Sequence, residues 1–463
     1  MPSEPARRVD PVSAEGLTRA LAHWAAETRF EDLPAHAVAT ARTLTLDTFG
    51  CAGAAADAEG VAALRAHVAE DGARGPATVW VHGDRVPASR AALVNGTMAA
   101  ALDFDPLHDR ATVHADIVTL PAALAVAERR GATGRDLLAA VIVGDELLCR
   151  LGLALSRHPG WFYTSVLGAF GAAAAAGRLL GLDAERMTHA FGIALSRAAG
   201  TQQSLIERRL TKRLQSAFAA EAGVEAALLA ARGITGPAEA LEGRAGFQAL
   251  YSPLDEAVLL GGLGRDFEMT RLTFKKYPSC FCNHAAIEAA LMLRRQGLAA
   301  DAVERIEVVL SPFMERLVGQ PFEPGDQPQV AAQFSVQYSI ACALARGRLG
   351  VAEIADDAVR DAAIGALAGR VRMRTDAAHP GRFAPIEVTA WTRDGRTLAA
   401  LGEILPGTPD HPLSGDEIEA KFRANVATGP RPLGPRAADA LMARLRGLDE
   451  LGPVVRLFDP LPD

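Results

Sequence analysis

The sequence predicts a mainly α fold, in which a large helical body is interrupted by a smaller part that mixes strands and helices. Helical periodicity of the apolar residues dominates residues 13–264, with short breaks at glycine or proline. Strand-like alternation appears later, at residues 305–310 and 385–391. Aromatic residues are only 5% of the 463 residues, so the core must be built mainly from Ala, Leu and Val, which favours closely packed helices.

The first part, residues 1–266, is expected to be helical. Thr133-Gly134 and Asp183 are residue types that begin helices, and a short strand pair is expected at 77–82, turned by Gly83-Asp84. The segments whose apolar residues gather on helical faces are 16–26, 35–48, 121–130, 134–155, 171–180 and 219–231.

The middle part, residues 267–405, is expected to be a small α+β domain. Residues 305–310 read as a strand, and residues 385–391 lead into an Asp394-Gly395 hairpin turn. Helical runs at 284–295 and 331–345 would pack on these strands.

The last part, residues 406–463, begins with a connector rich in proline and glycine. Helices at 414–426 and 435–448 follow it and are expected to return to the helical body.

Bulk properties exclude several classes of function. The net charge of -7 argues against nucleic acid as the main partner, because phosphate binding needs a net positive face. No P-loop and no Gly-x-Gly-x-x-Gly turn follows a strand, so a nucleotide cofactor is not expected. The polar stretch at residues 1–11 does not resemble a secretion signal, and the apolar run 166–182 consists of Ala and Gly with Arg178, as in a buried helix. We expect a cytoplasmic protein without a membrane span.

The five cysteines are odd in number and scattered, as reduced thiols of a cytosolic protein are. Only Cys280 and Cys282 lie close together, so neither an iron–sulfur cluster nor a structural zinc site is expected. We predict no metal and no organic cofactor.

Lysine and tyrosine are both rare, which draws attention to the few that are present. Where arginine is the preferred basic residue, a retained lysine points to a need for a compact ammonium whose pKa can be tuned, although ordinary solvated lysines are the alternative. A buried tyrosine can donate a proton, or it can simply be a core residue. The full sets are Lys212, Lys275, Lys276 and Lys421, and Tyr163, Tyr251, Tyr277 and Tyr338.

Three short segments concentrate groups that could carry chemistry. Residues 101–114 hold Asp103, Asp105, His108, Asp109 and His114 between two helical runs. Such a loop suits orientation and proton transfer better than metal binding, and a solvated polar loop is the alternative.

The second segment, residues 207–213, is strongly basic and contains Arg208, Lys212 and Arg213 just before a helix of small residues from Ser216 onward. Cations beside a helix N-terminus favour carboxylate binding, although a solvated run of charges is the alternative. The third segment, residues 275–284, combines an ammonium, thiols and an imidazole, and a thiol nucleophile at Cys280 is conceivable there.

Taken together in this order, the motifs resemble the MmgE/PrpD family, which includes 2-methylcitrate dehydratase, cis-aconitate decarboxylase and iminodisuccinate epimerase. The resemblance covers nearly the whole chain. It rests on Asn95-Gly-Thr, Ala101-Leu-Asp-Phe-Asp, His114 running into Leu120-Pro-Ala-Ala, Gly134-Arg-Asp-Leu-Leu, Thr164-Ser with Gly168-Ala-Phe-Gly, Thr211-Lys-Arg-Leu, Lys276-Tyr-Pro-Ser-Cys with His284, and Phe334-Ser with Tyr338.

The resemblance implies a large all-helical domain formed by both ends of the chain, an inserted smaller α+β lid domain, a homodimer, and catalysis without metal or organic cofactor in a cleft between the domains. It implies that Asp103 and His114 line this cleft, that Lys212 is its central cation and that Tyr338 faces it from the lid. His284, Cys280 and Lys275 lie in the matching lid segment, and which of them is functional stays open.

Three positions depart from the family pattern. The family often has a histidine where this chain has Phe162, and Tyr163 beside it is a candidate replacement as acid or base. The family commonly has Asp-Thr where this chain has Pro106-Leu107, and His-x-Gly where this chain has Gln215-Ser-Ala217. These losses argue against dehydration of 2-methylcitrate itself.

The preferred hypothesis is a lyase that passes through a carbanion next to a carboxylate of a small di- or tricarboxylate. Lys212 with Arg208, Arg209 or Arg213 would meet the negative charge, and His114, Tyr163 and Tyr338 are the candidate proton carriers. An isomerase of a dicarboxylate, with Lys212 and Tyr163 on opposite faces, is the alternative. A non-catalytic carboxylate-binding protein is the third hypothesis.

Overall fold

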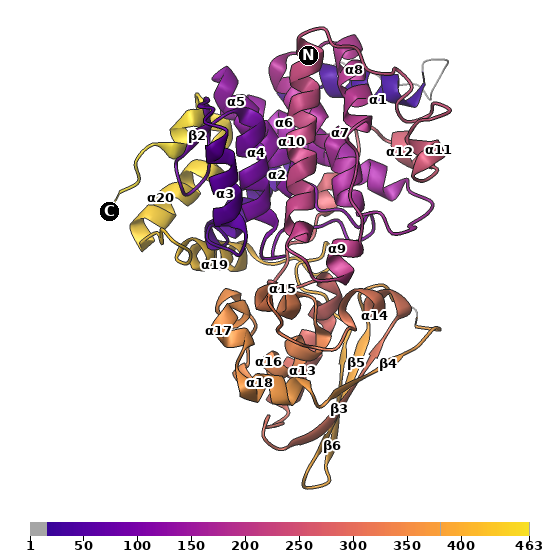
Figure 1. The fold of residues 1–463 in the computed structure, drawn as a ribbon, viewed down its shortest axis with the longest axis vertical. Coiled ribbons are helices and arrows are strands. Elements are labelled where there is room, and N and C mark those ends of the chain that lie inside the picture. Colours follow the sequence, from indigo (N-terminus) through magenta and orange to yellow (C-terminus); the bar gives the residue numbers. More distant parts are fainter. Residues whose placement is uncertain (1–15, 380, 463) are drawn as a thin grey trace, which may run out of the picture.

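The computed structural model describes residues 16–379 and 381–462, and it confirms a mainly α protein with a small sheet region. Figure 1 shows the helices of the first half at one end of the molecule and a four-stranded sheet with its helices at the other. The polar stretch 1–11, from which the absence of a secretion signal was predicted, lies outside the described residues. Within the described ranges no helix combines the length and the apolar character that a membrane crossing requires.

The first part of the chain is helical, with one short ribbon in which β1 (Ala77–Thr78) pairs antiparallel with β2 (Arg85–Val86). The helices are α1 (Leu17–Glu27), α2 (Ala35–Ala54), α3 (Val61–Glu70), α4 (Ala88–Ala100), α5 (Asp116–Arg130), α6 (Gly134–Leu153), α7 (Tyr163–Leu180), α8 (Ala184–Leu195), α9 (Gln203–Ile206), α10 (Thr211–Ala231), α11 (Phe247–Leu250) and α12 (Glu256–Leu260).

Helix starts follow the expected signals where a side chain caps the helix. The Thr133 hydroxyl accepts the backbone N–H of Asp136 at the start of α6, and Asp183 accepts that of Arg186 at the start of α8. Helices α7 and α10 begin earlier than predicted, at Tyr163 and Thr211, because neither start has a capping side chain to mark it. The basic segment therefore forms the first turn of α10 instead of preceding the helix.

Small residues let the central helices approach closely. A Cβ atom on Gly144 of α6 would lie 2.8 Å from the carbonyl oxygen of Gly171 in α7. A Cβ atom on Gly223 of α10 would lie 2.4 Å from the Cβ of Ala172, on another face of α7. Helix α7 is consequently buried from Tyr163 to Gly177, which agrees with a core of small aliphatic residues.

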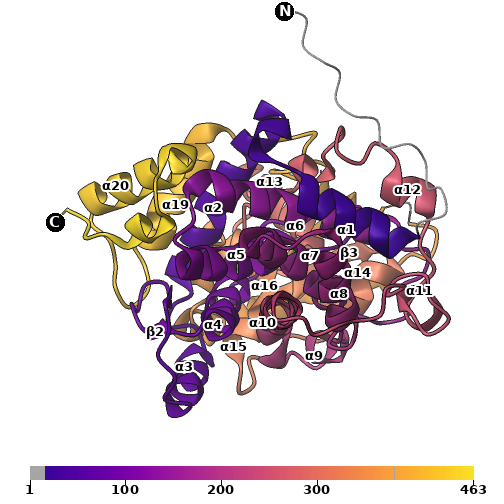
Figure 2. The same cartoon turned by 90° about the horizontal axis from the view of Figure 1, so that it is seen from above.

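The last part of the chain contains α19 (Gly415–Val426) and α20 (Pro435–Arg446). Both pack against α2, and a Cβ atom on Gly50 of α2 would lie 3.2 Å from the Phe422 ring. In Figure 2 these two helices lie at one side of the helical part, and α11 and α12 lie at the opposite side. The end of the chain thus contacts helices formed by its beginning.

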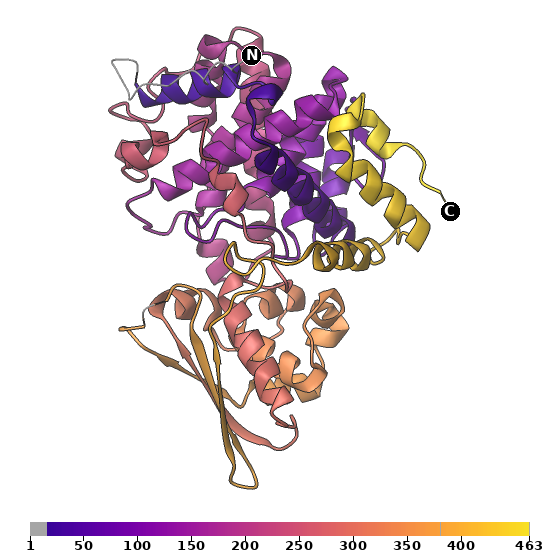
Figure 3. The ribbon, with the colours of Figure 1, turned by 180° about the vertical axis from the view of Figure 1, so that it is seen from behind.

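The α+β part has one four-stranded sheet in the order β4-β3-β5-β6. Strand β3 pairs parallel with β4 and antiparallel with β5, and β5 forms the predicted hairpin with β6 through the Asp394-Gly395 turn. Figure 3 shows helices on one face of the sheet. The elements are α13 (His284–Arg295), β3 (Val303–Leu310), α14 (Pro312–Val318), α15 (Pro328–Gln333), α16 (Val336–Arg346), α17 (Asp356–Val359), α18 (Ala362–Ala368), β4 (Val371–Thr375), β5 (Ile386–Thr392) and β6 (Thr397–Gly402).

One prediction for this part was wrong, and one strand was missed. The single helical run at 331–345 is two helices, because the Ser335 hydroxyl accepts the backbone N–H of Tyr338 and so begins α16 anew. Strand β4 was missed because its sequence, Val-Arg-Met-Arg-Thr, is mostly polar at the exposed edge of the sheet. The break after α15 leaves Gln333 and Phe334 facing the helical part, where the Gln333 amide donates to the Ala101 carbonyl at 3.1 Å.

A pair of buried carboxyl groups lies in the helical core, on α5 and α6. Both Asp116 and Asp145 are fully buried, and they accept hydrogen bonds from the hydroxyls of Thr48 and Thr119. Burial raises the pKa of Asp116 to about 7, and burial together with the negative charge of Asp116 raises that of Asp145 well above its usual value. At least one carboxyl of the pair therefore keeps its proton near neutral pH.

Replacing Asp145 with Asn should stabilise the protein at alkaline pH. An aspartate with a raised folded pKa holds a proton that the unfolded chain has lost above about pH 3.9, so stability falls as the pH rises through the folded pKa. The variant escapes this loss, and its melting temperature should exceed that of the parent protein by roughly 2 °C or more at pH 8, with a smaller gain at pH 5. Thermal unfolding at both pH values checks this, and an equal shift at both would contradict it.

Candidate active site

A cavity of about 620 Å³ lies between the helical part and the α+β part, and both parts line it. The lining includes the aromatic residues Trp161 and Phe162 from the helical part and Phe281, Phe313, Phe334 and Phe383 from the α+β part. The polar and charged lining residues are Asp103, Thr112, His114, His158, Tyr163, Gln202, Lys212, Lys275, Cys280, Cys282, Ser311, Arg316, His379 and Arg382.

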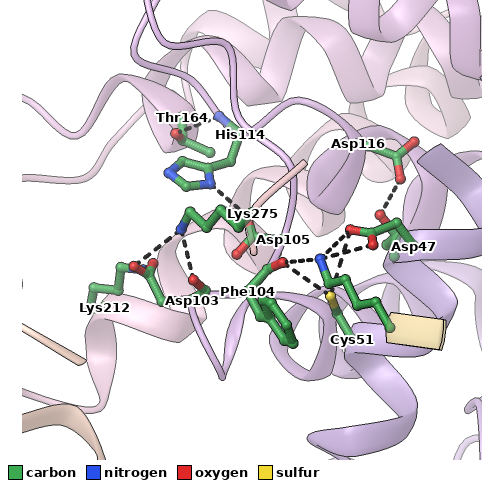
Figure 4. A network of polar contacts seen from close by, with 12 residues as sticks. Asp47, Cys51, Asp103, Phe104, Asp105, His114, Asp116, Thr164, Lys212 and Lys275 are labelled. Atoms are coloured by element: carbon green, nitrogen blue, oxygen red, sulfur yellow. Dashed lines mark hydrogen bonds and ion pairs between the residues drawn. The ribbon is translucent and has the colours of Figure 1, made fainter. Parts of the chain in front are cut away.

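Asp103 is the central charged group of the cavity. It follows α4 with a φ of 50°, in the left-handed region that side chains other than glycine seldom adopt. Lys212, in the first turn of α10, pairs with one carboxylate oxygen of Asp103. The Lys275 ammonium lies 3.2 Å from the other oxygen and donates to the Asp103 backbone carbonyl at 2.8 Å. Figure 4 shows the two lysines approaching this residue from different segments.

These contacts keep Asp103 and Lys275 charged. Burial by itself would raise the pKa of Asp103, but the ammonium groups of Lys212 and Lys275 hold it well below its usual range. Burial acts to lower the pKa of Lys275, yet the carboxylates of Asp103 and Asp105 raise it. The side chain of Lys275 is only 1% exposed, whereas that of Lys212 is 11% exposed, so Lys212 is the more accessible cation.

His114 forms an acid-base pair with Asp105, two residues beyond Asp103. The Nδ1 atom of His114 lies 2.6 Å from a carboxylate oxygen of Asp105, and the backbone N–H of His114 donates to the Thr164 hydroxyl at 3.1 Å. Burial opposes ionisation of Asp105, but His114 and Lys275 hold its pKa below the usual value. Because Nδ1 bonds the carboxylate, Nε2 is the ring nitrogen left to exchange a proton in the cavity.

Lys421 supports the same loop from behind; the sequence marked it only as a rare lysine and did not assign it to the site. Its ammonium donates to Asp47 at 2.9 Å and to the Phe104 carbonyl at 2.8 Å, between the two acidic residues of the loop. The Cys51 thiol donates to the same carbonyl at 3.4 Å. Lysine scarcity was the signal that could have found it, since three of the four lysines gather around residues 103–105.

Tyr163 lines the cavity on the side where the sequence departs from the family pattern. Its hydroxyl donates to the Arg157 carbonyl at 3.0 Å, and burial raises its pKa. His158, a second residue that sequence analysis missed, lines the cavity nearby with its ring 5.4 Å from that of Tyr163, edge to face. No local motif marked His158, because it precedes the segment that carried the resemblance.

The segment 275–284 is divided between the cavity and the core. Cys280 and Cys282 line the cavity, and a hydrogen bond from the Cys282 thiol lowers the pKa of Cys280. His284 is not among the lining residues; its ring is buried between Tyr277 and Phe281, and burial followed by the charge of Lys275 lowers its pKa to about 3. His284 is therefore neutral.

Three residues singled out from the sequence lie away from the cavity. Arg208 donates to the carbonyls of Gln320 and Pro321, at 2.9 and 3.1 Å, beside a separate surface depression. Arg213 is buried against the Glu59 carbonyl, and burial lowers its pKa to about 10. The Tyr338 hydroxyl donates to the Glu353 carbonyl inside the α+β part, so it does not face the cavity.

Comparisons with known proteins cover most of the chain. The MmgE/PrpD N-terminal domain matches residues 19–259, and the MmgE/PrpD C-terminal domain matches residues 277–433. Cis-aconitate decarboxylase of Homo sapiens is 28% identical over 81% of this chain and 79% of its own length. Cis-aconitate decarboxylase of Aspergillus terreus is 28% identical over 72% and 73%, and the cis-aconitate decarboxylase-like protein oryM of Aspergillus oryzae is 27% identical over 88% and 90%.

The two lysines on Asp103 should differ in their effect on stability. Replacing Lys275 with Met leaves a buried carbonyl without its donor and removes one of two cations from a buried carboxylate, a loss of about 2–4 kcal/mol. Replacing Lys212 with Met leaves Asp103 paired with Lys275 and should cost less than half as much. Denaturant unfolding of both variants measures the difference, with Lys276→Met, an exposed lysine paired with Glu288, as the neutral control. Equal losses for Lys212 and Lys275 would contradict this division.

Proposed function

Because the chain belongs to the MmgE/PrpD family, we propose that it is a lyase that acts on a small di- or tricarboxylate through a carbanion next to a carboxylate. The relatives named as cis-aconitate decarboxylases support decarboxylation of a cis-aconitate-like acid as the first reaction to test. The observation that carries the proposal is the accessible ammonium of Lys212, held by Asp103 inside the cavity between the two parts of the chain.

The chemistry needs a cation where negative charge accumulates. When a carboxylate on the saturated carbon next to a C=C bond leaves as carbon dioxide, the electrons of the broken C–C bond form a new C=C bond between that carbon and its neighbour. The electrons of the old C=C bond then move onto the carbon next to another carboxylate, which becomes enolate-like until a proton is added there. A prepositioned ammonium lowers the energy of such an anion more than water does. Lys212 is the residue of this cavity with the position and charge to do so.

The proton would come from a group on the cavity wall. His114 is the best placed, because Asp105 holds its Nδ1 atom and leaves Nε2 for exchange. Tyr163 is the second candidate and would take the place of the histidine that this chain lacks at Phe162. Its hydroxyl already donates to the Arg157 carbonyl, so it would have to exchange that bond before acting as an acid.

We also propose that the α+β part acts as a lid and that the reaction uses only groups of the chain itself. The lid proposal is supported by the residues that line the cavity, because Lys275, Cys280 and Phe334 belong to the α+β part. A lid that closes over the substrate would remove water from the developing anion and strengthen the effect of Lys212. The homodimer that the resemblance implies stays a prediction.

Replacing Lys212 with Met should abolish turnover of cis-aconitate while the protein stays folded. We expect kcat/KM to fall by about 100-fold or more, because the loss of one prepositioned charge at the reacting centre has an effect of this size. Proton NMR in deuterium oxide follows the reaction, and Lys276→Met, which removes a lysine outside the cavity, is the matched control. An active Lys212→Met variant would refute the role of this lysine.

The same NMR experiment separates the possible reactions. Loss of carbon dioxide with one deuterium incorporated identifies a decarboxylase, and loss of water from a hydroxy acid identifies a dehydratase. Exchange of the proton beside a carboxylate, without loss of either molecule, identifies an isomerase. Binding without turnover across a panel of di- and tricarboxylates would contradict the enzyme proposal and favour a carboxylate-binding protein.

Replacing Asp105 with Asn should slow proton transfer without weakening substrate binding. The amide can still contact His114, but it no longer favours a proton on Nδ1 or compensates a positive ring. We expect kcat to fall by about 10-fold or more, with KM nearly unchanged. Steady-state kinetics with the substrate identified above checks this, and a rise in KM at constant kcat would show that Asp105 serves binding instead.

A further inference from the structure

Two arginines line the cavity on the α+β side, and neither belongs to the Asp103 cluster. The guanidinium carbon of Arg382 lies 4.6 Å from the centre of the Phe313 ring, and that of Arg316 lies 5.6 Å from the same ring centre. Arg382 is half-buried and Arg316 is exposed at the edge of the cavity. The Phe313 ring therefore contacts both guanidinium groups.

Neither arginine has a carboxylate partner among the residues at 16–379 and 381–462. Every lysine that lines the cavity is paired with Asp103, whereas Arg316 and Arg382 contact aromatic faces. Burial lowers the pKa of Arg382 and the charge of Arg316 lowers it further, while Cys282 and Asp109 act in the opposite direction. Since an arginine in a protein does not lose its proton, two like charges remain around the Phe313 ring and favour an anion nearby in the cavity.

Backbone contacts on both sides of Arg382 constrain the chain at this position. The His379 ring accepts the backbone N–H of Gly381 on Nδ1 at 3.0 Å, and its Nε2 donates to the Pro385 carbonyl at 2.7 Å. A Cβ atom on Gly381 would lie 1.5 Å from the Ala384 carbonyl oxygen, so only glycine fits beside it. The arginine is therefore presented by a compact turn.

The distribution of positive and negative charges in the cavity indicates a role for these two arginines. At the Lys212 end, two ammonium groups face the carboxylates of Asp103 and Asp105, so the lysines leave no surplus positive charge there. A di- or tricarboxylate brings two or three negative charges into the cavity. The carboxylates remote from the reacting carbon therefore need cations elsewhere, and the unpaired cations of the wall are Arg316 and Arg382.

We infer that Arg382, assisted by Arg316, forms a second carboxylate-binding subsite that selects di- and tricarboxylates over monocarboxylates. The inference rests on the proposed function for the identity of the reacting end. The guanidinium of Arg382 offers a bidentate pair of N–H donors to a carboxylate, and Phe313 keeps its plane fixed. Arg316, at the edge of the cavity, attracts the anion and contributes less to its final binding.

The test uses tricarballylate, a saturated tricarboxylate without a C=C bond, and butyrate, a monocarboxylate. Ligand-observed proton NMR measures the binding of both to the full chain, because it detects weak complexes. The variants are Arg382→Gln, Arg382→Lys and Arg316→Gln. Arg305→Gln is the matched control, since Arg305 also stacks on an aromatic ring, that of Trp391 at 3.7 Å, but does not line the cavity.

We expect Arg382→Gln to weaken tricarballylate binding by about 10- to 100-fold and Arg316→Gln to weaken it by about 3-fold. Arg382→Lys should recover part of the loss, because it keeps the charge and loses the bidentate geometry. Butyrate binding should change by less than about 2-fold in every variant, and Arg305→Gln should match the parent protein. Unchanged tricarballylate binding in a folded Arg382→Gln variant, or equal loss for both ligands, would overturn the subsite.

The outcomes for the subsite and for the lyase proposal are separable. Binding of tricarballylate requires no turnover, so a selective loss in Arg382→Gln supports the subsite even if no lyase activity is found. If cis-aconitate is turned over, Arg382→Gln should raise KM by a similar factor and leave kcat within about 3-fold. Normal KM in that variant would overturn the subsite while leaving the lyase proposal intact.

Discussion

The buried negative charge of Asp103 is the constraint on which the site depends. An ionised carboxylate that is only 3% exposed is tolerated inside a protein when cations and hydrogen bonds surround it. The two lysines that pair with Asp103 lie far apart in the sequence. Lys212 is in the first turn of α10, and Lys275 is in the segment that enters the α+β part. Neutralising this one group therefore requires both parts of the chain to meet, and the cavity lies at that meeting point. The Gln333 amide on the Ala101 carbonyl reinforces the same junction.

The helical part supplies the rigidity that this junction needs. Glycines in α6, α7 and α10 bring the helices close enough that α7 is buried on every side, so the start of α10 has little freedom to shift. The loop after α4 is held from the opposite side by Lys421, whose ammonium reaches the Phe104 carbonyl from α19. The end of the chain thus positions an acidic loop formed near its beginning. Positioning within fractions of an ångström is what electrostatic catalysis demands.

Sequence patterns predicted the elements better than they predicted which side chains meet. Helical periodicity located the helices, and the Asp394-Gly395 turn located the β5–β6 hairpin, because these signals are local. Strand β4 was missed, since its alternation of Val371 and Met373 with two arginines spans only five residues. For the site, residue types gave Asp103, His114, Tyr163, Lys212, Lys275 and Cys280 on the cavity wall. They also gave Arg208, Arg213 and Tyr338, whose partners are backbone carbonyls that only the folded chain brings near. Arg316 and Arg382 lie in segments without a motif, and only packing unites them.

The departures from the family pattern bear on the reaction, because two of the three lie on the cavity wall. Leu107 and Phe162 both line the cavity, whereas the Gln215 amide is engaged with the Thr201 backbone and the Ser204 hydroxyl. Expulsion of water requires an acid that protonates the departing hydroxyl. Neither leucine nor phenylalanine can supply such an acid. At these two positions the cavity surface is apolar, whereas the family pattern has polar residues there. Loss of carbon dioxide requires no such acid at the departing group, and an apolar surface beside a carboxylate destabilises its charge before it leaves. A dehydration in this cavity would therefore have to take its acid from His114 or Tyr163, the proton carriers that line the wall.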